Sequence, residues 1–288
     1  METGPLSTIR KNKIKDHLNK ENSSYQNTRL SIQLSLNGLS FCTLDPYHQE
    51  VTRYEYLDFG WEIDTQDLGI KLSQFIGDHQ IDKYTYQAIQ VVHTNHLFGV
   101  VPQSLFDPQY LNSYVKYNTA LLANDTLSHD LIQPWDIQVV YVPFANANNL
   151  IFDRFGSFEY HHHTELLFKI LRPGLLDNSE STLLIHLQGQ LMTIMVFQGK
   201  KLLLVNVFKA FTEEDFMYYL LFVGEQIQID IHKTQFIASG GLNEGHPYWL
   251  RMIDHLGEIN NCTVEHAYQF AEHLDPKGID PLTLTALF

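Results

Sequence analysis

The stretch "LSIQLSLNGLSFCTLD" (30–45) decides the fold, because its plan returns in the second half of the chain. It predicts a strand, a two-residue Asn-Gly turn and a second strand, since Asn-Gly is the strongest short signal for a β-hairpin. Both residues of such a turn must accept a positive φ. "EVTRYEYLDF" (50–59) predicts a third strand. A helix over 64–79, with apolar residues at helical spacing, and a strand over 88–93 follow.

The same order of elements recurs after residue 183. "LLIHLQG", "QLMTIMVFQG" and "KKLLLVNVF" predict three successive strands. "TEEDFMYYLLFVGEQIQI" (212–229) predicts a helix with Thr212 as N-cap and acidic residues in its first turn, where the helix dipole favours them. The strand "QFIAS" (235–239) completes the set. The two halves share little residue identity, so the repeat is one of topology.

Further strands and helices lie between these two sets. Among them are a helix over 107–123, capped by Asp107, and the strand "SFEYHHH" (157–163) followed by the helix "TELLFKILR". Strands and helices interleave throughout, which indicates a mixed α/β protein with two lobes. We expect a flexible polar leader over 1–27, an N-terminal lobe over 28–176 and a C-terminal lobe over 177–288, with "DNSES" as the linker.

Composition excludes several classes of function. The 288 residues carry a net charge of -14, which makes DNA and RNA poor partners. No apolar region follows Met1, and no run reaches the roughly 18 apolar residues that a membrane helix needs, so we expect a cytoplasmic protein. Cys42 and Cys262 cannot build a disulfide framework, and we expect both to be buried as small hydrophobic residues.

The residues give little support for catalytic chemistry. In "EYHHHTE" (159–165), a strand would place at most His161 and His163 on one face, and no partner ligand is marked, so we assign no metal site. The sequence has no nucleophile elbow, no Walker-type phosphate loop and no Gly-x-Gly-x-x-Gly after a strand. We therefore assign no catalytic residue.

The repeated plan resembles the superfamily of actin, sugar kinases and heat-shock ATPases, whose lobes have a ribonuclease H-like fold. "LSIQLSLNGLSFCTLD", "YVPFANANNLIFDRFGSFEY" and "KLLLVNVFKAFTEEDFMYYLLFVGEQIQID" are more specifically similar to an uncharacterised bacterial family of unknown function. That family in turn resembles the actin-like proteins of type IV pilus assembly. The resemblance runs from about residue 28 to the C-terminus. It implies an actin-like α/β fold of two similar lobes, each a mixed β-sheet flanked by helices, and it implies no activity.

The superfamily resemblance also implies positions for a nucleotide. Its members hold phosphates on the first hairpin of each lobe and adenosine on a strand that ends in a Gly-Gly turn. The matching cofactor-binding positions are Asn37, Gly38, Gln188, Gly189, Ser239, Gly240 and Gly241. We expect them to line one cleft between the lobes.

The phosphate-loop positions depart from the superfamily pattern. An ATPase of this kind needs carboxylates there to hold magnesium and to orient water. The first hairpin offers Gln33, Ser35 and Asn37, and the second offers His186 and Gln188. We therefore expect no enzymatic activity and no cofactor, and a protein that binds an unidentified protein partner. The alternative is a switch that binds ATP weakly with little or no hydrolysis.

The helix over 212–229 is the candidate contact surface, because it is more apolar than a one-sided amphipathic helix requires. Its residues Phe216, Leu220, Val223 and Ile227 fall on one face, which we expect to be core. The neighbouring lobe or a partner is expected to cover Tyr218, Tyr219 and Phe222 in part.

Overall fold

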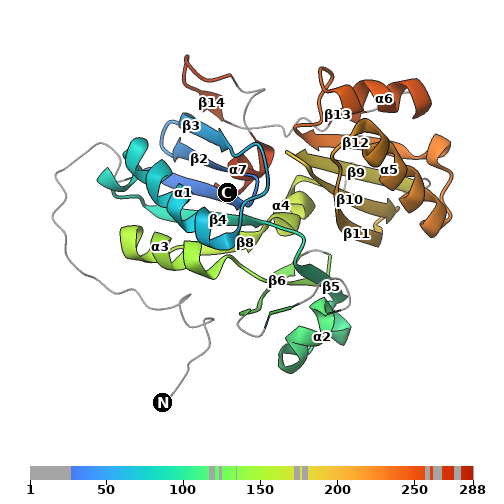
Figure 1. Ribbon diagram of the computed structural model, residues 1–288, viewed down its shortest axis with the longest axis horizontal. Coiled ribbons are helices and arrows are strands. Elements are labelled where there is room, and N and C mark those ends of the chain that lie inside the picture. Colours follow the sequence, from blue (N-terminus) through green and yellow to red (C-terminus); the bar gives the residue numbers. More distant parts are fainter. Residues whose placement is uncertain are drawn as a thin grey trace. The chain divides into compact units, whose positions relative to one another are not determined.

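The computed structural model (Figure 1) describes residues 27–116, 121–122, 125–133, 135–171, 176, 181–256, 260–261, 268–275 and 280–287. The chain divides into two compact units. Unit 1 comprises Met1–Leu166 and His266–Phe288, and unit 2 comprises Leu167–Glu265. The predicted leader over 1–27, apart from its last residue, lies outside the described residues, as does most of the predicted linker.

Unit 1 is built on a six-stranded mixed sheet with the strand order β14-β3-β2-β1-β4-β8. β1 pairs with β2 in an antiparallel hairpin and with β4 in parallel. Every residue of β1 after Arg29 is buried, as expected of a central strand whose sheet is covered on both faces. The strands are β1 (Arg29–Ser35), β2 (Gly38–Asp45), β3 (Glu50–Asp58), β4 (Ala88–Thr94), β8 (Glu159–His162) and β14 (Gln269–Phe270).

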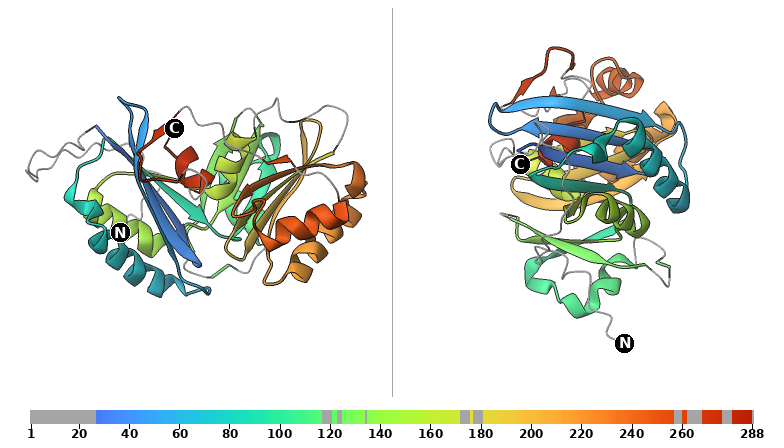
Figure 2. Two further views of the ribbon diagram at one scale, coloured as in Figure 1. Left: turned by 90° about the horizontal axis from the view of Figure 1, so that it is seen from above. Right: turned by 90° about the vertical axis from the view of Figure 1, so that its left-hand side faces the viewer.

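Helices cover both faces of this sheet. α1 (Thr65–Asp78), whose N-terminus is capped by the Asp64 carboxylate, packs with α3 (Ala145–Phe155) on one face. The short helix α7 (Pro281–Thr285) lies against β1 and β2 on the other face (Figure 2). α4 (His163–Ile170) follows β8 directly. Unit 1 therefore has the layered α/β arrangement that the sequence predicts.

A second, three-stranded sheet belongs to unit 1, in the order β5-β7-β6. Its strands are β5 (Phe98–Pro102), β6 (Ser128–Ile132) and β7 (Ile137–Tyr141), and α2 (Leu111–Val115) packs against it. The sequence reasoning did not predict β6. It also placed the helix start too early, because Asp107 caps a separate 3-10 turn, Pro108–Tyr110, and α2 begins only at Leu111. The other 3-10 turns are Ile81–Lys83, Gln103–Leu105 and Ile231–Lys233.

Unit 2 contains a five-stranded sheet in the order β11-β10-β9-β12-β13. Both α5 and α6 pack on one face of it and enclose the core of the unit. Thr212 and Asp215 form a reciprocal capping box that fixes the start of α5, as the predicted N-cap required. The elements are β9 (Ser181–Gln188), β10 (Leu191–Gln198), β11 (Lys201–Lys209), α5 (Glu213–Ile227), β12 (Gln235–Gly240), α6 (Pro247–Leu256) and β13 (Asn260–Asn261).

The two units repeat one topology. The order β3-β2-β1-β4-β8 in unit 1 corresponds to β11-β10-β9-β12-β13 in unit 2, with a helix before the fourth strand in each. The predicted mixed α/β class and the repeated plan are confirmed. The units differ from the predicted lobes in two respects. Unit 2 begins at Leu167 and not at 177. Residues from His266 onward belong to unit 1, because β14 pairs with β3 and α7 packs on β1 and β2. Pairing between distant segments leaves no local signal in the sequence.

The predicted core face of α5 is confirmed. Phe216, Leu220 and Val223 are buried, and Ile227 is partly buried against the same core. On the opposite side, Tyr218 is 60% exposed and Phe222 is 39% exposed, and their rings stack on one another.

Two expectations that were based on composition can be compared with the structure. Cys42 is a buried free thiol in β2, whereas Cys262 lies outside the described residues. Among the residues that the structure describes, no helix is both long and apolar enough to cross a membrane.

Candidate functional site

The first hairpin, between β1 and β2, turns at Leu36 and Asn37. The Asn37 backbone donates to the Ser35 hydroxyl at 3.1 Å, and the Asn37 carbonyl accepts from Phe59 N at 2.9 Å. Neither Asn37 nor Gly38 has a positive φ, so the predicted turn type is wrong. Glycine is required at 38 for a different reason: a Cβ there would lie 2.7 Å from the Leu57 carbonyl oxygen of β3.

A buried polar network lies beneath this hairpin and ties it to α7. The Gln33 side-chain oxygen accepts from Ser40 Oγ at 3.2 Å and from Thr283 Oγ1 at 2.7 Å. The Gln33 side-chain nitrogen donates to Thr94 Oγ1 at 3.2 Å. Gln33, one of the polar groups that the sequence offered at this loop, is thus engaged within unit 1.

Sequence reasoning missed two carboxyl groups near the first hairpin. Asp58 lies opposite Gly38 in the β2–β3 register, and its carboxylate accepts from Gly60 N at 2.8 Å. Asp280 is partly buried at the start of α7, where its carboxylate accepts from Leu282 N at 2.8 Å. Burial raises the pKa of Asp280 to about 6, against the lowering effect of hydrogen bonds that include one from Gln33. Both carboxylates therefore cap backbone groups. Asp280 lies far from Gln33 in the sequence, and no local motif could have connected them.

The second hairpin and the Gly-Gly turn adjoin each other in unit 2. β9 and β12 run in parallel with Gly240 opposite Leu187, and Gly241 N donates to the Leu187 carbonyl at 2.7 Å. Gln188 and Gly189 follow Leu187 directly, and Gly189 has a φ of 54°. The structure thus brings together Gln188, Gly189, Ser239, Gly240 and Gly241, at the carboxyl ends of two adjacent parallel strands, where α/β proteins often bind ligands.

Gly240 is the glycine of this turn that no other residue replaces without strain. Its φ is +70°, and a Cβ at this position would overlap the Leu187 carbonyl oxygen and lie 2.7 Å from His186 Cε1. His186 and Ser239 share a hydrogen bond of 3.2 Å. Burial lowers the pKa of His186 to about 3, so this ring is neutral at physiological pH. The turn therefore packs closely against a neutral histidine ring and not against a charged side chain.

Three buried polar atoms at these positions have no hydrogen-bond partner within the described residues: Asn37 Oδ1, Gln188 Oε1 and His186 Nε2. Buried polar atoms of this kind are uncommon and call for a functional or structural explanation. Asn37 belongs to unit 1 and the other two to unit 2. The shared cleft of all three turns therefore stays a prediction.

The histidine run does not form one continuous strand. β8 ends at His162 and His163 is the first residue of α4, so the predicted strand over 157–163 extends one residue too far. His161 instead lies 2.9 Å from the carboxylate of Glu165, one helical turn further along the chain.

Comparison with known proteins agrees with this architecture. A family model described as a protein of unknown function (DUF3822) matches residues 16–256. No curated protein matches the chain. A solved Bacteroides thetaiotaomicron protein with actin-like ATPase fold and unknown function is similar over 85% of this chain and 94% of its own, with 16% identity and a TM-score of 0.70.

A chain of a PilM–PilN type IV pilus biogenesis complex is also similar. The match covers 90% of this chain and 97% of the other, with 10% identity and a TM-score of 0.53. The two structural matches confirm the predicted actin-like fold, and the family match confirms the predicted family of unknown function.

Proposed function

We propose that this chain, which belongs to the DUF3822 family of proteins of unknown function, is a non-catalytic actin-like protein that acts by binding another protein. The observation that carries the proposal is the chemistry of the two hairpins. No residue of either turn or of the Gly-Gly turn carries a carboxylate, and two of the carboxyl groups near the first turn, Asp58 and Asp280, cap backbone N–H groups. A phosphoryl transfer site of this type needs carboxylates to hold magnesium and to orient water.

Two observations support a protein as the ligand. The similar chain from the PilM–PilN complex belongs to an assembly of two named proteins. In unit 2, α5 exposes Tyr218, Leu221 and Phe222 side by side on its outer face. We call these three residues the α5 strip. Aromatic residues are enriched at protein interfaces because they bury a large area at a small cost in conformational entropy.

The proposal predicts that capture of a partner from an extract of the source cells depends on the α5 strip. The double variant Tyr218→Ser with Phe222→Ser is expected to lose most of the captured protein. Both side chains are exposed, so the free energy of unfolding should change by less than about 1 kcal/mol. The measurement is the amount of co-purified protein, quantified by mass spectrometry with the unchanged full chain as reference.

The matched control is the double variant Ile70→Ser with Phe152→Ser. These residues expose apolar area of similar size on the neighbouring helices α1 and α3 of unit 1. The control is expected to capture the same protein as the unchanged chain. Equal capture by both double variants would show that the α5 strip is not the contact surface.

The alternative, an ATP-binding switch, has its own supporting observation. In unit 2, Gln188 Oε1 and His186 Nε2 are buried without a partner within the described residues, and the hydroxyl and amino groups of an adenosine would supply donors for them. The non-catalytic proposal assigns no cofactor, so it predicts that ATP does not stabilise the protein. The switch hypothesis predicts that bound ATP raises the free energy of unfolding.

Thermal unfolding with and without ATP and magnesium separates the two. Ligand at a hundred times its dissociation constant adds roughly 2.7 kcal/mol to the free energy of unfolding, which raises the melting temperature visibly. We expect no shift at millimolar ATP. A shift that disappears in Gln188→Ala would instead support the switch, because that side chain is one of the unsatisfied groups.

A further inference from the structure

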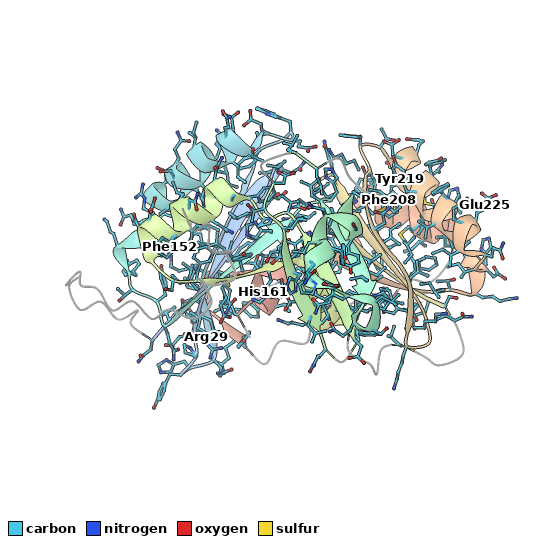
Figure 3. The ribbon with its side chains drawn as sticks, turned by 90° about the horizontal axis from the view of Figure 1, so that it is seen from below. Arg29, Phe152, His161, Phe208, Tyr219 and Glu225 are labelled. Atoms are coloured by element: carbon cyan, nitrogen blue, oxygen red, sulfur yellow. The ribbon has the colours of Figure 1, made fainter. Side chains whose placement is uncertain are left out.

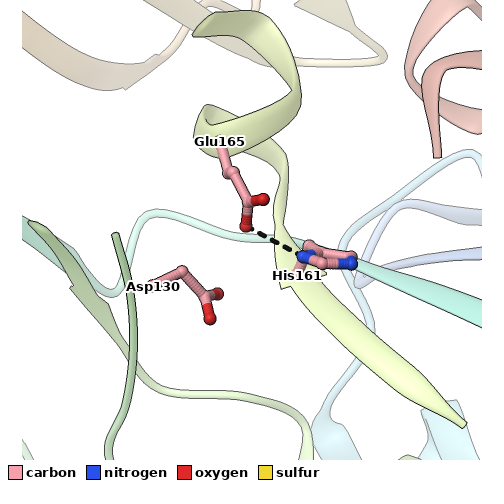
Figure 4. A group of neighbouring side chains, drawn as sticks. All are labelled: Asp130, His161 and Glu165. Atoms are coloured by element: carbon pink, nitrogen blue, oxygen red, sulfur yellow. Dashed lines mark hydrogen bonds and ion pairs between the residues drawn. The ribbon is translucent and has the colours of Figure 1, made fainter. Parts of the chain in front are cut away.

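We propose that Asp130, His161 and Glu165 form a binding site for a divalent transition-metal ion. The three residues come from β6, β8 and α4 of unit 1, and their ligand atoms all lie within 4.8 Å of one another. Figure 4 shows the three side chains directed towards a common point. This site is distinct from the hairpins and the Gly-Gly turn, so it stands independently of the proposed function.

The hydrogen bonds around His161 determine which of its ring nitrogens carries a proton. Gln90 Nε2 donates to the Glu159 carboxylate at 3.0 Å, which leaves Gln90 Oε1 facing His161 Nε2 at 2.9 Å. An amide oxygen only accepts, so His161 Nε2 must donate to it. The remaining nitrogen, His161 Nδ1, then presents its lone pair to the site whenever the ring is neutral. A metal-binding histidine usually donates the N–H of its other ring nitrogen to a hydrogen-bond acceptor of the protein, as His161 Nε2 does here to Gln90 Oε1.

Glu165 and Asp130 supply the oxygen ligands. Glu165 Oε2 lies 2.9 Å from His161 Nδ1. Because α4 begins directly after β8 ends at His162, Glu165 lies in the first turn of α4, close to His161. Asp130 is held by Tyr141, whose hydroxyl donates to Asp130 Oδ2 at 2.8 Å. Asp130 is 6% exposed and Glu165 is 8% exposed, so both carboxylates are largely shielded from water. The surrounding residues therefore hold both carboxylates in place before an ion binds.

The donor set indicates the class of ion. One imidazole nitrogen with two carboxylate oxygens suits zinc, manganese or iron(II), whereas magnesium and calcium prefer oxygen ligands alone. A divalent ion neutralises the two carboxylate charges. Ligand bonds of about 2.1 Å place tetrahedral donors about 3.4 Å apart, so a small rotation of Asp130 completes the site and leaves at least one position for water or another ligand.

The test is a titration of the chelator-treated full chain with Zn²⁺, followed by calorimetry, with Co²⁺ absorption as a second readout of the ligand geometry. We expect one Zn²⁺ per chain at this site. Glu165→Gln and Asp130→Asn should each weaken binding at least tenfold. In Glu165→Gln the side-chain amide donates to the Nδ1 lone pair of the neutral His161 ring, so the metal-free chain keeps a contact here and its melting temperature should change little. This outcome separates ligation from a structural role.

The matched control is His48→Gln. His48 pairs with Asp45 at 2.7 Å, but this pair is exposed and consists of two metal-ligating residues, whereas the proposed site has three. Its loss is expected to leave zinc affinity unchanged. Absence of zinc uptake by the unchanged chain would overturn the proposal, as would uptake that Glu165→Gln and Asp130→Asn both leave intact. In the first case His161 and Glu165 form an ordinary ion pair, and in the second the zinc binds adventitiously to other histidines.

Discussion

Lowering the pH from 7 to 5 is expected to destabilise both compact units, because each holds histidines that are buried in the neutral form. Burial lowers the pKa of His93 in unit 1 and of His186 in unit 2 to about 3. It also holds the pKa of His162 well below its ordinary value of 6.5, with a contribution from the neighbouring His163. The unfolded chain binds protons on these residues below about pH 6.5, and the folded chain does not.

The sign and size follow from linkage. The stability that these histidines contribute is complete above about pH 6.5 and is lost as the pH falls towards 3. Each of His93 and His186 makes the free energy of unfolding about 2 kcal/mol lower at pH 5 than at pH 7. Asp280 acts in the opposite direction: its pKa is raised to about 6 from 3.8, so the folded state takes up this proton first as the pH falls. That gain is about 1 kcal/mol at pH 5 and offsets only part of the loss.

Urea denaturation at pH 7 and pH 5 measures this effect. Trp249 is buried in the core of unit 2, so its fluorescence follows the unfolding of that unit. In His186→Gln the loss for unit 2 between the two pH values should become about 2 kcal/mol smaller. His48→Gln is the control, since the His48 side chain is exposed and pairs with the Asp45 carboxylate at the surface. Equal urea midpoints at pH 7 and pH 5 would contradict the buried neutral histidines.

Truncation of Leu220 on α5 is the second large effect. Leu220 is fully buried among the core residues of unit 2, so Leu220→Ala is expected to cost about 2–5 kcal/mol through lost packing and the cavity that it leaves. Tyr219 is only partly buried and stacks on Phe208 of β11 with ring centroids 4.8 Å apart (Figure 3). Tyr219→Ala should therefore cost less than Leu220→Ala in chemical denaturation at pH 7.

Equal losses of stability would mean that Tyr219 is packed as tightly as Leu220, so that its contact with Phe208 belongs to the core of unit 2.

The elements with strong local signals could be predicted from the sequence. Apolar alternation gave the strands around each hairpin, and the caps Asp64 and Thr212 marked the starts of α1 and α5. β6 was missed because "SHDLI" is short and carries a buried aspartate, which is atypical of a core strand. The C-terminal segment was assigned to the wrong unit because β14 and α7 pack on strands more than 200 residues away in sequence.

The candidate site could be predicted only in part. The unit 2 positions around Gln188 and Gly240 are adjacent, as the parallel pairing of β9 and β12 requires. A glycine is required at 38 by the nearby Leu57 carbonyl, and not by the positive φ on which the predicted turn was based. The grouping of Asp130 with His161 depends on how two separate sheets pack, which no sequence spacing encodes.

Phosphate release from ATP and magnesium by the full chain tests the central claim most directly. The account predicts a rate indistinguishable from a buffer blank, because the turn of neither hairpin carries a carboxylate to hold the metal. Magnesium-dependent release above the blank that is lost in Asn37→Ala or Gln188→Ala would contradict it, since the amides would then support catalysis. Release that is lost in Asp58→Asn or Asp280→Asn would contradict it equally, because a capping carboxylate would then have a catalytic role.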